Sequence, residues 1–312
     1  MRVHFHPHYC ATDVAFDTTR KAAAIARSLV ERPIAGVELV EPEPLTREQL
    51  LTVHSEAYVD AVLTGEPREL ALTNELPGWD AGLARAVSAS NGGVLAAARY
   101  AVAQRTIAGS LSSGLHHARR EAGAGYCTFN GLAIAAVDAI ARGARRVLVL
   151  DVDAHCGGGT ASIIGGTAGI IGGIEQLDVS VDPFDTYEPP PNVRLVMSDT
   201  DRLLATVRAE LARVEQPSTI DLVLHNAGMD PHHGCEGGLP GIDAAVLGER
   251  ERIVFEWIAA HRLPAAWVLA GGYTNRISMG ELVELHRLTI SAAALAEPAV
   301  SAHTTRSVGE RT

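Results

Sequence analysis

Short apolar runs that end in polar or acidic residues recur through the second half of the chain. The clearest is RRVLVLDVDAH (145–155), in which Val and Leu fill the positions just before Asp151. A run that is apolar at successive positions, and not only at alternate ones, is typical of a strand buried on both faces of a sheet. Comparable runs predict further strands at 177–181, 193–197, 221–225 and 265–270.

Segments with helical patterning lie between most of these runs, at 201–215, 241–261 and 281–296. Strand followed by helix, repeated along the chain, favours a mainly parallel sheet with helices on both faces. No linker rich in Pro or Ser interrupts the series, and no internal repeat is found. We therefore expect a single α/β domain over residues 1–296, followed by a frayed polar tail over 297–312.

The first half of the chain predicts one short strand and several helices. Thr46 and Gln49 have the spacing of a capping box, in which each side chain bonds the backbone N–H of the other residue. The expected elements are a strand at 2–5, a helix from Thr18 or Thr19 to Val30, a helical segment from Ser55 through Val62, and helices at 80–104 and 130–141, the last ended by Gly143.

The composition is that of a folded, acidic protein. Hydrophobic residues make up 47% and charged residues 20% of the 312, which allows a sizeable core and excludes a disordered chain. The 26 basic and 37 acidic side chains give a net charge of −11, which opposes binding to nucleic-acid phosphates. An acidic surface suits a cationic small molecule or a basic peptide, although solubility alone also explains the charge.

The cysteines and the chain start bear on location. Cys10, Cys127, Cys156 and Cys235 stand far apart, a spacing that suggests neither a disulfide framework nor a thiolate zinc site and that favours a reducing compartment. The first residues lack a basic segment followed by an apolar one, and no apolar run approaches the ~18 residues of a membrane span. We expect a cytoplasmic protein that does not enter a membrane.

Candidate functional side chains follow three of the predicted strands. In a parallel sheet the carboxyl ends of the strands lie at one edge, where ligands bind. We therefore expect these side chains to meet on one side of the sheet. They are Asp151, Asp153 and His155 after the first run, Asn226 and Asp230 after 221–225, and Gly271, Gly272 and Tyr273 after 265–270.

Asp153 and His155 are two positions apart, so in an extended segment their side chains point the same way. With Asp230 from another strand end, they would supply three ligands to one divalent cation and leave a position open for water. One imidazole and two carboxylates fit Zn²⁺, and also Fe²⁺, Co²⁺ or Mn²⁺. Taken alone, an Asp-x-His pattern also fits capping or hydrogen bonding at a strand end.

His116 and His117 form an adjacent pair in a Gly-rich stretch, LSSGLHHARREAGAGY (111–126). The two are either surface histidines or, beside a metal ion, a general base and a general acid, because imidazole titrates near neutral pH. Asp151 could bind the same metal or accept a hydrogen bond from one histidine and orient it.

Gly271-Gly272-Tyr273 places a phenol after a flexible backbone that can approach a ligand closely. The Tyr273 hydroxyl could donate a hydrogen bond to a developing oxyanion. The alternative is an ordinary turn with a half-buried tyrosine.

Together these motifs resemble those of the histone deacetylase family, which has the arginase-deacetylase fold. The resemblance covers most of the chain in the family's order and implies an open, mostly parallel sheet flanked by helices. The matching stretches are LLTVHSEAYVDAV (50–62), GLHHARREAGAGYCTFNGLAIAA (114–136), RVLVLDVDAHCGGGT (146–160), LVLHNAGMDP (222–231) and VLAGGYTN (268–275).

The resemblance implies a role for each candidate residue. The metal ligands would be Asp153, His155 and Asp230. His116 and His117 would be the paired histidines, and Asp151 would be the carboxylate that orients His116. Tyr273 would be the phenol that polarises the carbonyl. Substrate-binding positions would be Gly125, Tyr126, Gly271 and Gly272, with Phe184 as a facing wall. The implied reaction is metal-assisted hydrolysis of an N-acyl amide, in an acylated amine or polyamine or in an acyl-lysine peptide. Zn²⁺ is the expected metal, and a structural K⁺ is a further implied ion.

The chain departs from the family pattern at three places. Cys156 stands where a second histidine is usual, as a reactive thiol, a ligand or a small buried filler. Gly158 stands where an Asn or Asp usually orients the second histidine of the pair, so His117 lacks its partner unless another side chain substitutes. The loop over 231–241 carries His232, His233, Cys235 and Glu236, which are either solvated or able to bind a ligand.

Two classes of function therefore stay open. The first is a metal-dependent amidohydrolase, supported by the metal ligands, the histidine pair and Tyr273 together. The second is a non-catalytic relative that binds an acylated ligand or peptide, motivated by Gly158. A binuclear ureohydrolase would need more carboxylates around 151–155 than the sequence has. The sequence leaves open the acyl group, the amine, the oligomeric state and the pathway.

Overall fold

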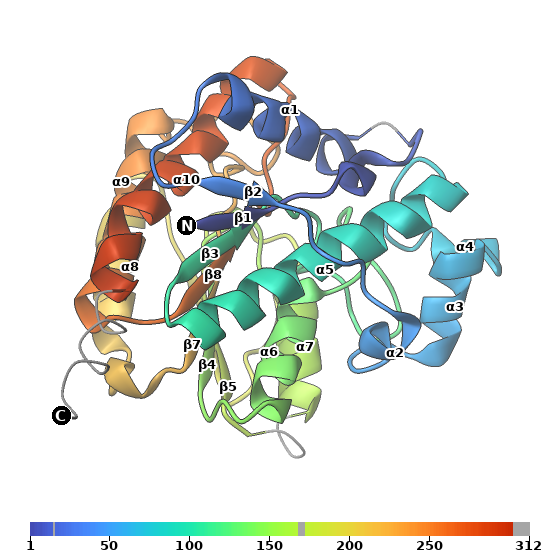
Figure 1. Ribbon diagram of the computed structural model, residues 1–312, viewed down its shortest axis with the longest axis horizontal. Helices are drawn as coiled ribbons and strands as arrows, with labels where there is room; N and C mark the ends of the chain where they lie inside the picture. The colour runs from blue at the N-terminus through green and yellow to red at the C-terminus, as the bar shows by residue number, and fades with distance from the viewer. Residues whose placement is uncertain (15, 168–171, 302–312) are drawn as a thin grey trace, which may run out of the picture.

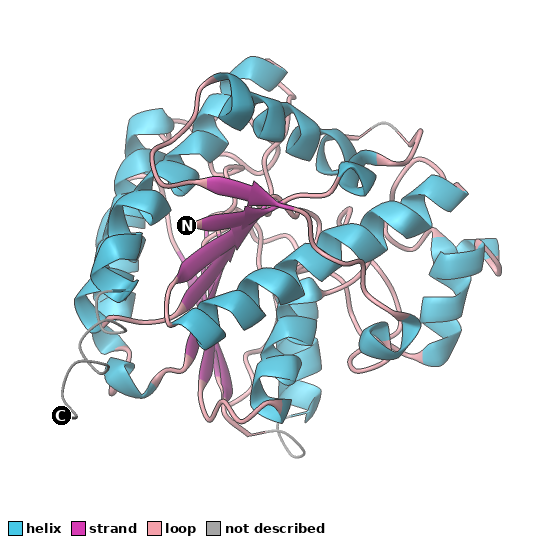
Figure 2. Cartoon of the chain, viewed as in Figure 1, coloured by secondary structure: helices cyan, strands magenta, loops and turns pink. Residues whose placement is uncertain are grey.

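A single eight-stranded sheet organises the computed structural model, which describes residues 1–14, 16–167 and 172–301. Every pair of neighbouring strands in it is parallel, and the order is β2-β1-β3-β8-β7-β4-β5-β6. Figure 2 shows the strands as one twisted layer between helices. The strands are β1 Arg2–His4, β2 Glu38–Val40, β3 Ile107–Ser110, β4 Val147–Asp151, β5 Ile174–Ser180, β6 Val193–Met197, β7 Leu222–Asn226 and β8 Ala265–Val268. The predicted α/β class and parallel sheet are confirmed.

Helices cover both faces of the sheet. Figure 1 views the sheet nearly edge-on, with α1, α9 and α10 on one side and α5, α6 and α7 on the other. The helices are α1 Asp17–Glu31, α2 Arg47–Leu50, α3 Glu56–Thr64, α4 Arg68–Ala71, α5 Ala81–Gln104, α6 Gly131–Ala141, α7 Gly158–Thr167, α8 Leu203–Arg213, α9 Ala244–His261 and α10 Met279–Ser301, with short 3-10 turns at Pro7–Cys10 and Pro217–Thr219.

The continuous apolar runs of the central strands supply two hydrophobic cores. In β4, Leu148 and Leu150 belong to the core that includes α1, α8, α9 and α10. Val147 and Val149 point the other way, into the core that includes α3, α5, α6 and α7. Because successive side chains of a strand alternate between faces, only a run that is apolar at every position can serve both cores.

The predicted starts of α2, α5 and α6 are confirmed by their caps, whereas α1 begins at Asp17 after Phe16 and not at Thr18 or Thr19. The Asp80 side chain accepts a hydrogen bond from Leu83 N at the start of α5, and Asn130 does the same for Ala133 N at the start of α6. Thr46 and Gln49 make both hydrogen bonds of the capping box. These side chains satisfy backbone N–H groups that the first turn of a helix leaves without partners.

Four helices and strands were not expected from the sequence, namely β2, β3, α4 and α7. Strand β3 has only four residues, and Gly109 in it lies so close to Trp267 that an added Cβ would stand 2.0 Å from the indole. Helix α10 begins before residue 281 and continues past 296 to Ser301 with Pro298 inside it, so 297–301 are helical and not a frayed tail. The rest of that tail, 302–312, lies outside the described residues.

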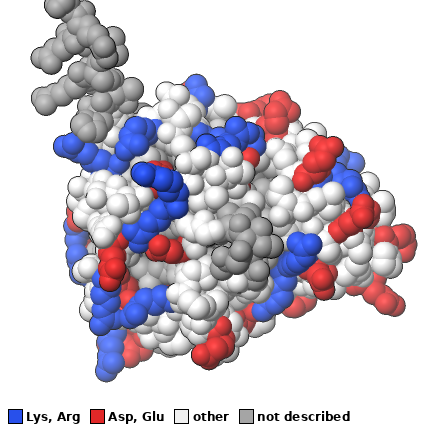
Figure 3. All heavy atoms as spheres, turned by 90° about the horizontal axis from the view of Figure 1, so that it is seen from below, with Lys and Arg blue, Asp and Glu red and all other residues white. Residues whose placement is uncertain are grey.

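The surface carries both signs of charge. Figure 3 shows one face on which basic and acidic side chains lie beside each other. On exposed helices these form ion pairs, such as Arg208 with Glu249 and Arg252 with Glu256. Among the helices that the structure describes, none combines the length and apolar character needed to cross a bilayer.

Candidate metal centre and catalytic site

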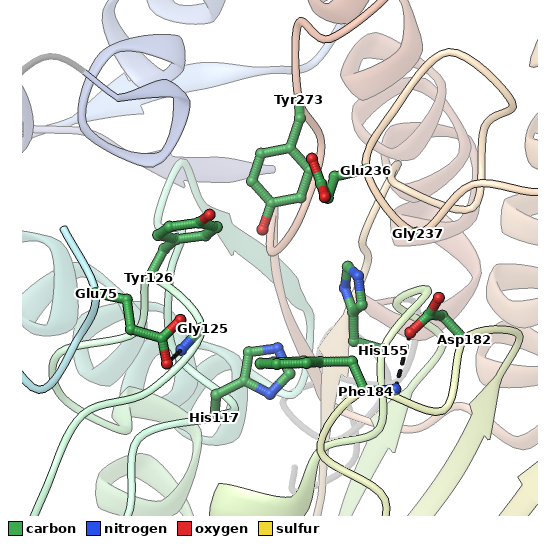
Figure 4. A pocket seen from close by; sticks show the side chains of 10 residues that line it. All are labelled: Glu75, His117, Gly125, Tyr126, His155, Asp182, Phe184, Glu236, Gly237 and Tyr273. Atoms are coloured by element: carbon green, nitrogen blue, oxygen red, sulfur yellow. Dashed lines mark hydrogen bonds between the residues drawn. The ribbon is translucent and has the colours of Figure 1, made fainter. Parts of the chain in front are cut away.

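The polar side chains at the ends of β4, β7 and β8 converge at the carboxyl edge of the sheet, as predicted. They border a cavity of about 590 Å³ that is open to solvent. Figure 4 shows side chains from several loops pointing into it, with the Tyr273 hydroxyl directed inward. The lining residues are Glu75, His117, Gly125, Tyr126, His155, Asp182, Phe184, Glu236, Gly237 and Tyr273.

Asp153, His155 and Asp230 form one buried cluster whose candidate ligand atoms all lie within 4.8 Å of one another. His155 Nδ1 lies 3.3 Å from Asp153 Oδ1 and 3.2 Å from Asp230 Oδ2. The other carboxylate oxygens are held by backbone N–H groups, Asp153 Oδ2 by Gly271 at 2.8 Å and Asp230 Oδ1 by Ala154 at 3.0 Å. The cluster is therefore fixed before any ion binds.

The donor set fits a divalent cation. Asp230 Oδ2 is buried and accepts no hydrogen bond from any residue that the structure describes, although such an atom ordinarily has a partner. Burial and the negative charge of Asp153 raise the pKa of Asp230 to about 6. Burial lowers the pKa of His155, but the two carboxylates outweigh it and raise that pKa to about 11. Two buried carboxylates around one imidazole thus concentrate negative charge, which a bound metal ion would neutralise.

His116 is oriented by Asp151, as the resemblance implies. His116 Nδ1 lies 2.9 Å from Asp151 Oδ2, and the second oxygen of Asp151 accepts hydrogen bonds from Asn226 Nδ2 and the backbone N of Asp153. His116 Nε2 lies 3.5 Å from Asp153 Oδ1. Burial lowers the pKa of His116, but the charges of Asp151 and Asp153 raise it to about 10.

His117 has a carboxylate partner that the sequence did not reveal. His117 Nδ1 lies 2.9 Å from Asp185 Oδ2, and Asp185 also pairs with Arg119. Asp185 lies in the loop between β5 and β6, far in sequence from position 158. Burial lowers the pKa of His117 to about 4, and the charge of His116 adds to this effect. The histidines are in ring contact, with centroids 3.9 Å apart, and are buried instead of on the surface.

Tyr273 lies on the opposite side of the cavity from His117 (Figure 4). Burial and the charges of Asp230 and Asp153 raise the pKa of its hydroxyl well above the usual value, so the phenol keeps its proton at neutral pH. Its backbone is held by Cys235, whose Sγ accepts from Tyr273 N and donates to Tyr273 O. Tyr273 thus offers a protonated hydroxyl on an anchored backbone.

Gly271 and Gly272 were predicted to bind substrate, and neither is among the residues that line the cavity. Both lie behind the Tyr273 loop, where other groups approach closely. A Cβ on Gly271 would stand 1.9 Å from Asp230 Oδ2, and one on Gly272 would stand 2.8 Å from His286 Nε2. In the structure Gly271 makes room for the carboxylates of Asp230 and Asp153, and Gly272 makes room for His286.

Gly125, Tyr126 and Phe184 all line the cavity. Gly125 has φ +49°, and a Cβ there would stand 2.5 Å from the His117 ring and 2.8 Å from Phe184. The Phe184 and His117 rings meet edge to face, with centroids 5.0 Å apart. Tyr126 packs on Phe16 at 4.1 Å, so its ring is fixed from behind. The result is a channel with aromatic sides that leads to His155.

Three carboxylates, those of Glu75, Asp182 and Glu236, also line the cavity, and none of its lining residues is Lys or Arg. Glu236 is held by Asn275 Nδ2 at 2.8 Å, and Asp182 Oδ1 accepts from Phe184 N. The cavity therefore presents negative charge beside an apolar channel, which favours a ligand with positive charge.

Cys156 is buried away from the cavity, whereas the loop over 231–241 supplies a polar side chain to it. Burial raises the pKa of Cys156 to about 12, and its Sγ contacts Asp182 O and Met197 Sδ, as expected of a small buried filler. His232 and His233 stack on each other, and neither joins a metal-capable group among the described residues. Of the polar residues in this loop, Glu236 reaches the cavity.

Comparison with known proteins agrees with this geometry. A model of the histone deacetylase domain matches residues 15–171, half of the chain. The chain belongs to the histone deacetylase family. An uncharacterised protein of Picosynechococcus is 30% identical over 260 residues, which are 82% of this chain and 85% of that protein. Histone deacetylase 2 of Arabidopsis thaliana is 27% identical over 247 residues, 75% of this chain and 63% of that deacetylase.

The fold is shared with a solved structure of the family. Acetylpolyamine aminohydrolase from Burkholderia pseudomallei superposes with a TM-score of 0.73 at 20% identity, over 95% of this chain and 99% of that one. At this identity the likeness concerns the fold alone. The predicted arginase-deacetylase fold is confirmed.

Several residues of the site were missed in the sequence. Asp185, Arg119, Glu75 and Asp182 lie in loops with no periodic pattern, and their sequence spacing shows no relation to the histidines or strand ends. The one available signal was Gly158, because a missing partner for His117 implies a substitute somewhere in the fold. Locating that substitute needed the structure.

Proposed function

We propose that this member of the histone deacetylase family is a metal-dependent amidohydrolase that removes an acyl group from an amine. The observation that carries the proposal is the buried Asp153, His155 and Asp230 cluster, placed beside two histidines that each have a carboxylate partner. This combination supplies a metal centre and a proton-transfer pair at the end of one channel.

Asp153, His155 and Asp230 would hold one divalent cation, with Zn²⁺ as the expected metal and Fe²⁺, Co²⁺ or Mn²⁺ as alternatives. Bound there, it would polarise the acyl carbonyl and lower the pKa of a water molecule. The carboxylates are anchored by the backbone N–H groups of Gly271 and Ala154, so they do not reorganise when charge develops in the cavity.

The side chains around the cluster have complementary tasks. His117 holds Nδ1 against Asp185, which leaves the lone pair of Nε2 to accept a proton from the attacking water. Tyr273 donates its hydroxyl hydrogen to the oxyanion that forms from the carbonyl. A protonated histidine of the pair then returns a proton to the leaving amine. Tyr126 and Phe184 enclose the acyl chain and its linker.

The substrate class follows from the cavity wall. Carboxylates at Glu75, Asp182 and Glu236 favour an amide attached to further positive charge. An acylated polyamine and an acyl-lysine in a basic peptide both have this property. The aromatic channel suits the unbranched alkyl chain that links the amide to the rest of either substrate.

Removal of metal is expected to abolish deacylation, because the bound cation would both polarise the substrate carbonyl and activate the attacking water. The chain loaded with Zn²⁺, Fe²⁺, Co²⁺ or Mn²⁺ would be assayed on N-acetylputrescine, N¹-acetylspermidine and an acetyl-lysine peptide. Chelation should lower turnover by at least ~100-fold, and one equivalent of metal should restore it. Metal-replete chain that hydrolyses none of these amides would contradict the proposed function.

Neutralising the cavity wall is expected to weaken binding of cationic substrates. Glu236→Gln keeps the size of the side chain and should raise KM for N¹-acetylspermidine by roughly 3- to 10-fold with kcat little changed, because exposed charge contributes to binding more than to chemistry. Glu215→Gln, near the opposite edge of the sheet, is the matched control. An unchanged KM at low salt would show that Glu236 does not select for charge.

The alternative, a non-catalytic relative that binds an acylated ligand, depended on an unpartnered His117. Asp185 fills that position, so no observation now favours this reading. A binuclear ureohydrolase is disfavoured because the second metal-capable group of the described residues is His116, His117 and Cys127, which has no carboxylate. The structural K⁺, the cytoplasmic location and the absence of a nucleic-acid partner stay predictions.

A further inference from the structure

We propose that Asp185 is the positioning residue for His117. Its carboxylate does the work of the side chain that the family pattern has at position 158, although it comes from another loop. Asp185 fixes the ring so that Nδ1 carries the hydrogen and Nε2 faces the cavity. The kinetic part of this inference rests on the proposed deacylation, while its structural part depends on the hydrogen bonds alone.

Three hydrogen-bond donors converge on the Asp185 carboxylate. His117 Nδ1 lies 2.9 Å and Gly159 N lies 3.2 Å from Oδ2, and the Arg119 guanidinium bonds both oxygens. A carboxylate is the one common side-chain group that accepts at every position and donates at none. Arg119 also donates to His117 O, so histidine, carboxylate and guanidinium form a closed set.

Gly158 leaves the space that Asp185 occupies. A Cβ at position 158 would stand 2.5 Å from the Asp185 backbone O and 2.7 Å from its Oδ1. No residue other than glycine fits there while Asp185 keeps its place. The glycine at position 158 and the carboxylate from the β5–β6 loop therefore depend on each other, because the carboxylate fits only where position 158 has no side chain.

The backbone of Asp185 also serves this geometry. Its φ is +59°, in the left-handed region that glycine and asparagine tolerate best. This turn directs the side chain inward, where it is mostly buried: 8% of it is exposed, against 44% exposure for the neighbouring residue Phe184. The conformation restricts the test variants to Gly and Asn, which add no backbone strain.

A purely structural role must be separated from positioning. Asp185 accepts from Gly159 N in the first turn of α7, as a helix cap would. Asp243 caps α9 by accepting from Val246 N at 3.0 Å, at a place that contributes no side chain to the cavity. Asp243→Gly is therefore the matched control for the loss of a capping carboxylate.

The experiment combines NMR of His117 with kinetics on the zinc-loaded full chain. Nitrogen-15 labelling of histidine reports which ring nitrogen carries the hydrogen, and His117→Gln assigns the signal. Wild type should show the Nδ1–H form. Asp185→Gly should lose this preference and lower kcat by about 10- to 100-fold, with KM within about 3-fold, as for other partners that orient an active-site histidine. Asp185→Asn should keep the Nδ1–H form and most of the turnover, and Asp243→Gly should change neither.

Each result decides the proposal. An Asp185→Gly chain whose His117 keeps the wild-type hydrogen position, or whose kcat equals that of Asp243→Gly, would overturn it. If Asp185→Gly does not fold, the wild-type spectrum decides the proposal, because a His117 ring with its hydrogen on Nε2 would overturn it and one with its hydrogen on Nδ1 would support it. If wild type deacylates nothing, the proposed function fails, and the NMR comparison still decides whether Asp185 positions His117.

Discussion

Replacing Asp230 with asparagine is expected to remove both the metal ion and the activity. Asp230 Oδ2 is buried, accepts no hydrogen bond from a described residue and lies 3.2 Å from His155 Nδ1, so it is placed to share a cation with that imidazole. An amide keeps the bond from Ala154 N but binds Zn²⁺ poorly. Bound metal should fall from about one per chain to below about a tenth, and turnover by at least ~10³-fold.

Metal content by mass spectrometry and turnover would be measured on the same preparation. Asp243→Asn, at an exposed helix cap, controls for expression and folding. If Asp230→Asn kept a full equivalent of metal and wild-type turnover, Asp230 would not be a ligand and the assignment of the cluster would be wrong.

Tyr273→Phe is expected to separate metal binding from catalysis. The substitution removes a hydroxyl that points into the cavity and leaves Asp153, His155 and Asp230 untouched. Loss of one fixed donor to an oxyanion costs about 10²- to 10³-fold in kcat. We expect that loss with metal content and KM nearly unchanged, because the hydrogen bond strengthens only as negative charge develops.

The matched control is Tyr100→Phe, since Tyr100 lies on α5 under the Arg2 guanidinium and does not line the cavity. Both variants would be compared by metal content, kcat and KM. A Tyr273→Phe chain as active as Tyr100→Phe would show that the oxyanion is stabilised without this phenol.

The centre of the fold could be predicted because its signals are local. The run over 147–151 is apolar until the strand ends, and Asp153 and His155 follow at a spacing that sends both the same way. Placing Asp230 with them required only that β4 and β7 be parallel, since parallel strands end at one edge. The sequence therefore led to the Asp153, His155 and Asp230 cluster from pattern and topology together.

Two of the missed elements, β3 and α7, contain glycines that close packing requires. Helix α7 reads GGTASIIGGT, a sequence that propensity alone disfavours as a helix. Two of its glycines allow other segments to approach the helix closely. A Cβ at Gly159 would stand 2.3 Å from the His117 backbone, and one at Gly165 would stand 2.6 Å from Pro190. Sequence reasoning treats such glycines as helix breakers, whereas here close packing against His117 and Pro190 explains two of them.

The partner of His117 could not be predicted for a different reason. Asp185 and His117 are 68 positions apart, and the loop between β5 and β6 has neither a hydrophobic period nor a capping pattern to fix its path. The position of Asp185 follows from contacts with two other segments, Gly158 and Gly159 of α7 and Arg119 of the loop before α6. Such a contact is a property of the assembled fold.

The most direct test of the metal centre is a crystal structure grown with Zn²⁺ and examined by anomalous scattering. The account predicts one ion bound by Asp153, His155 and Asp230 at about 2.0–2.2 Å. The rival position is the second buried group, His116, His117 and Cys127. An ion found there, or no ion at the first cluster, would contradict the metal centre on which the proposed hydrolysis depends.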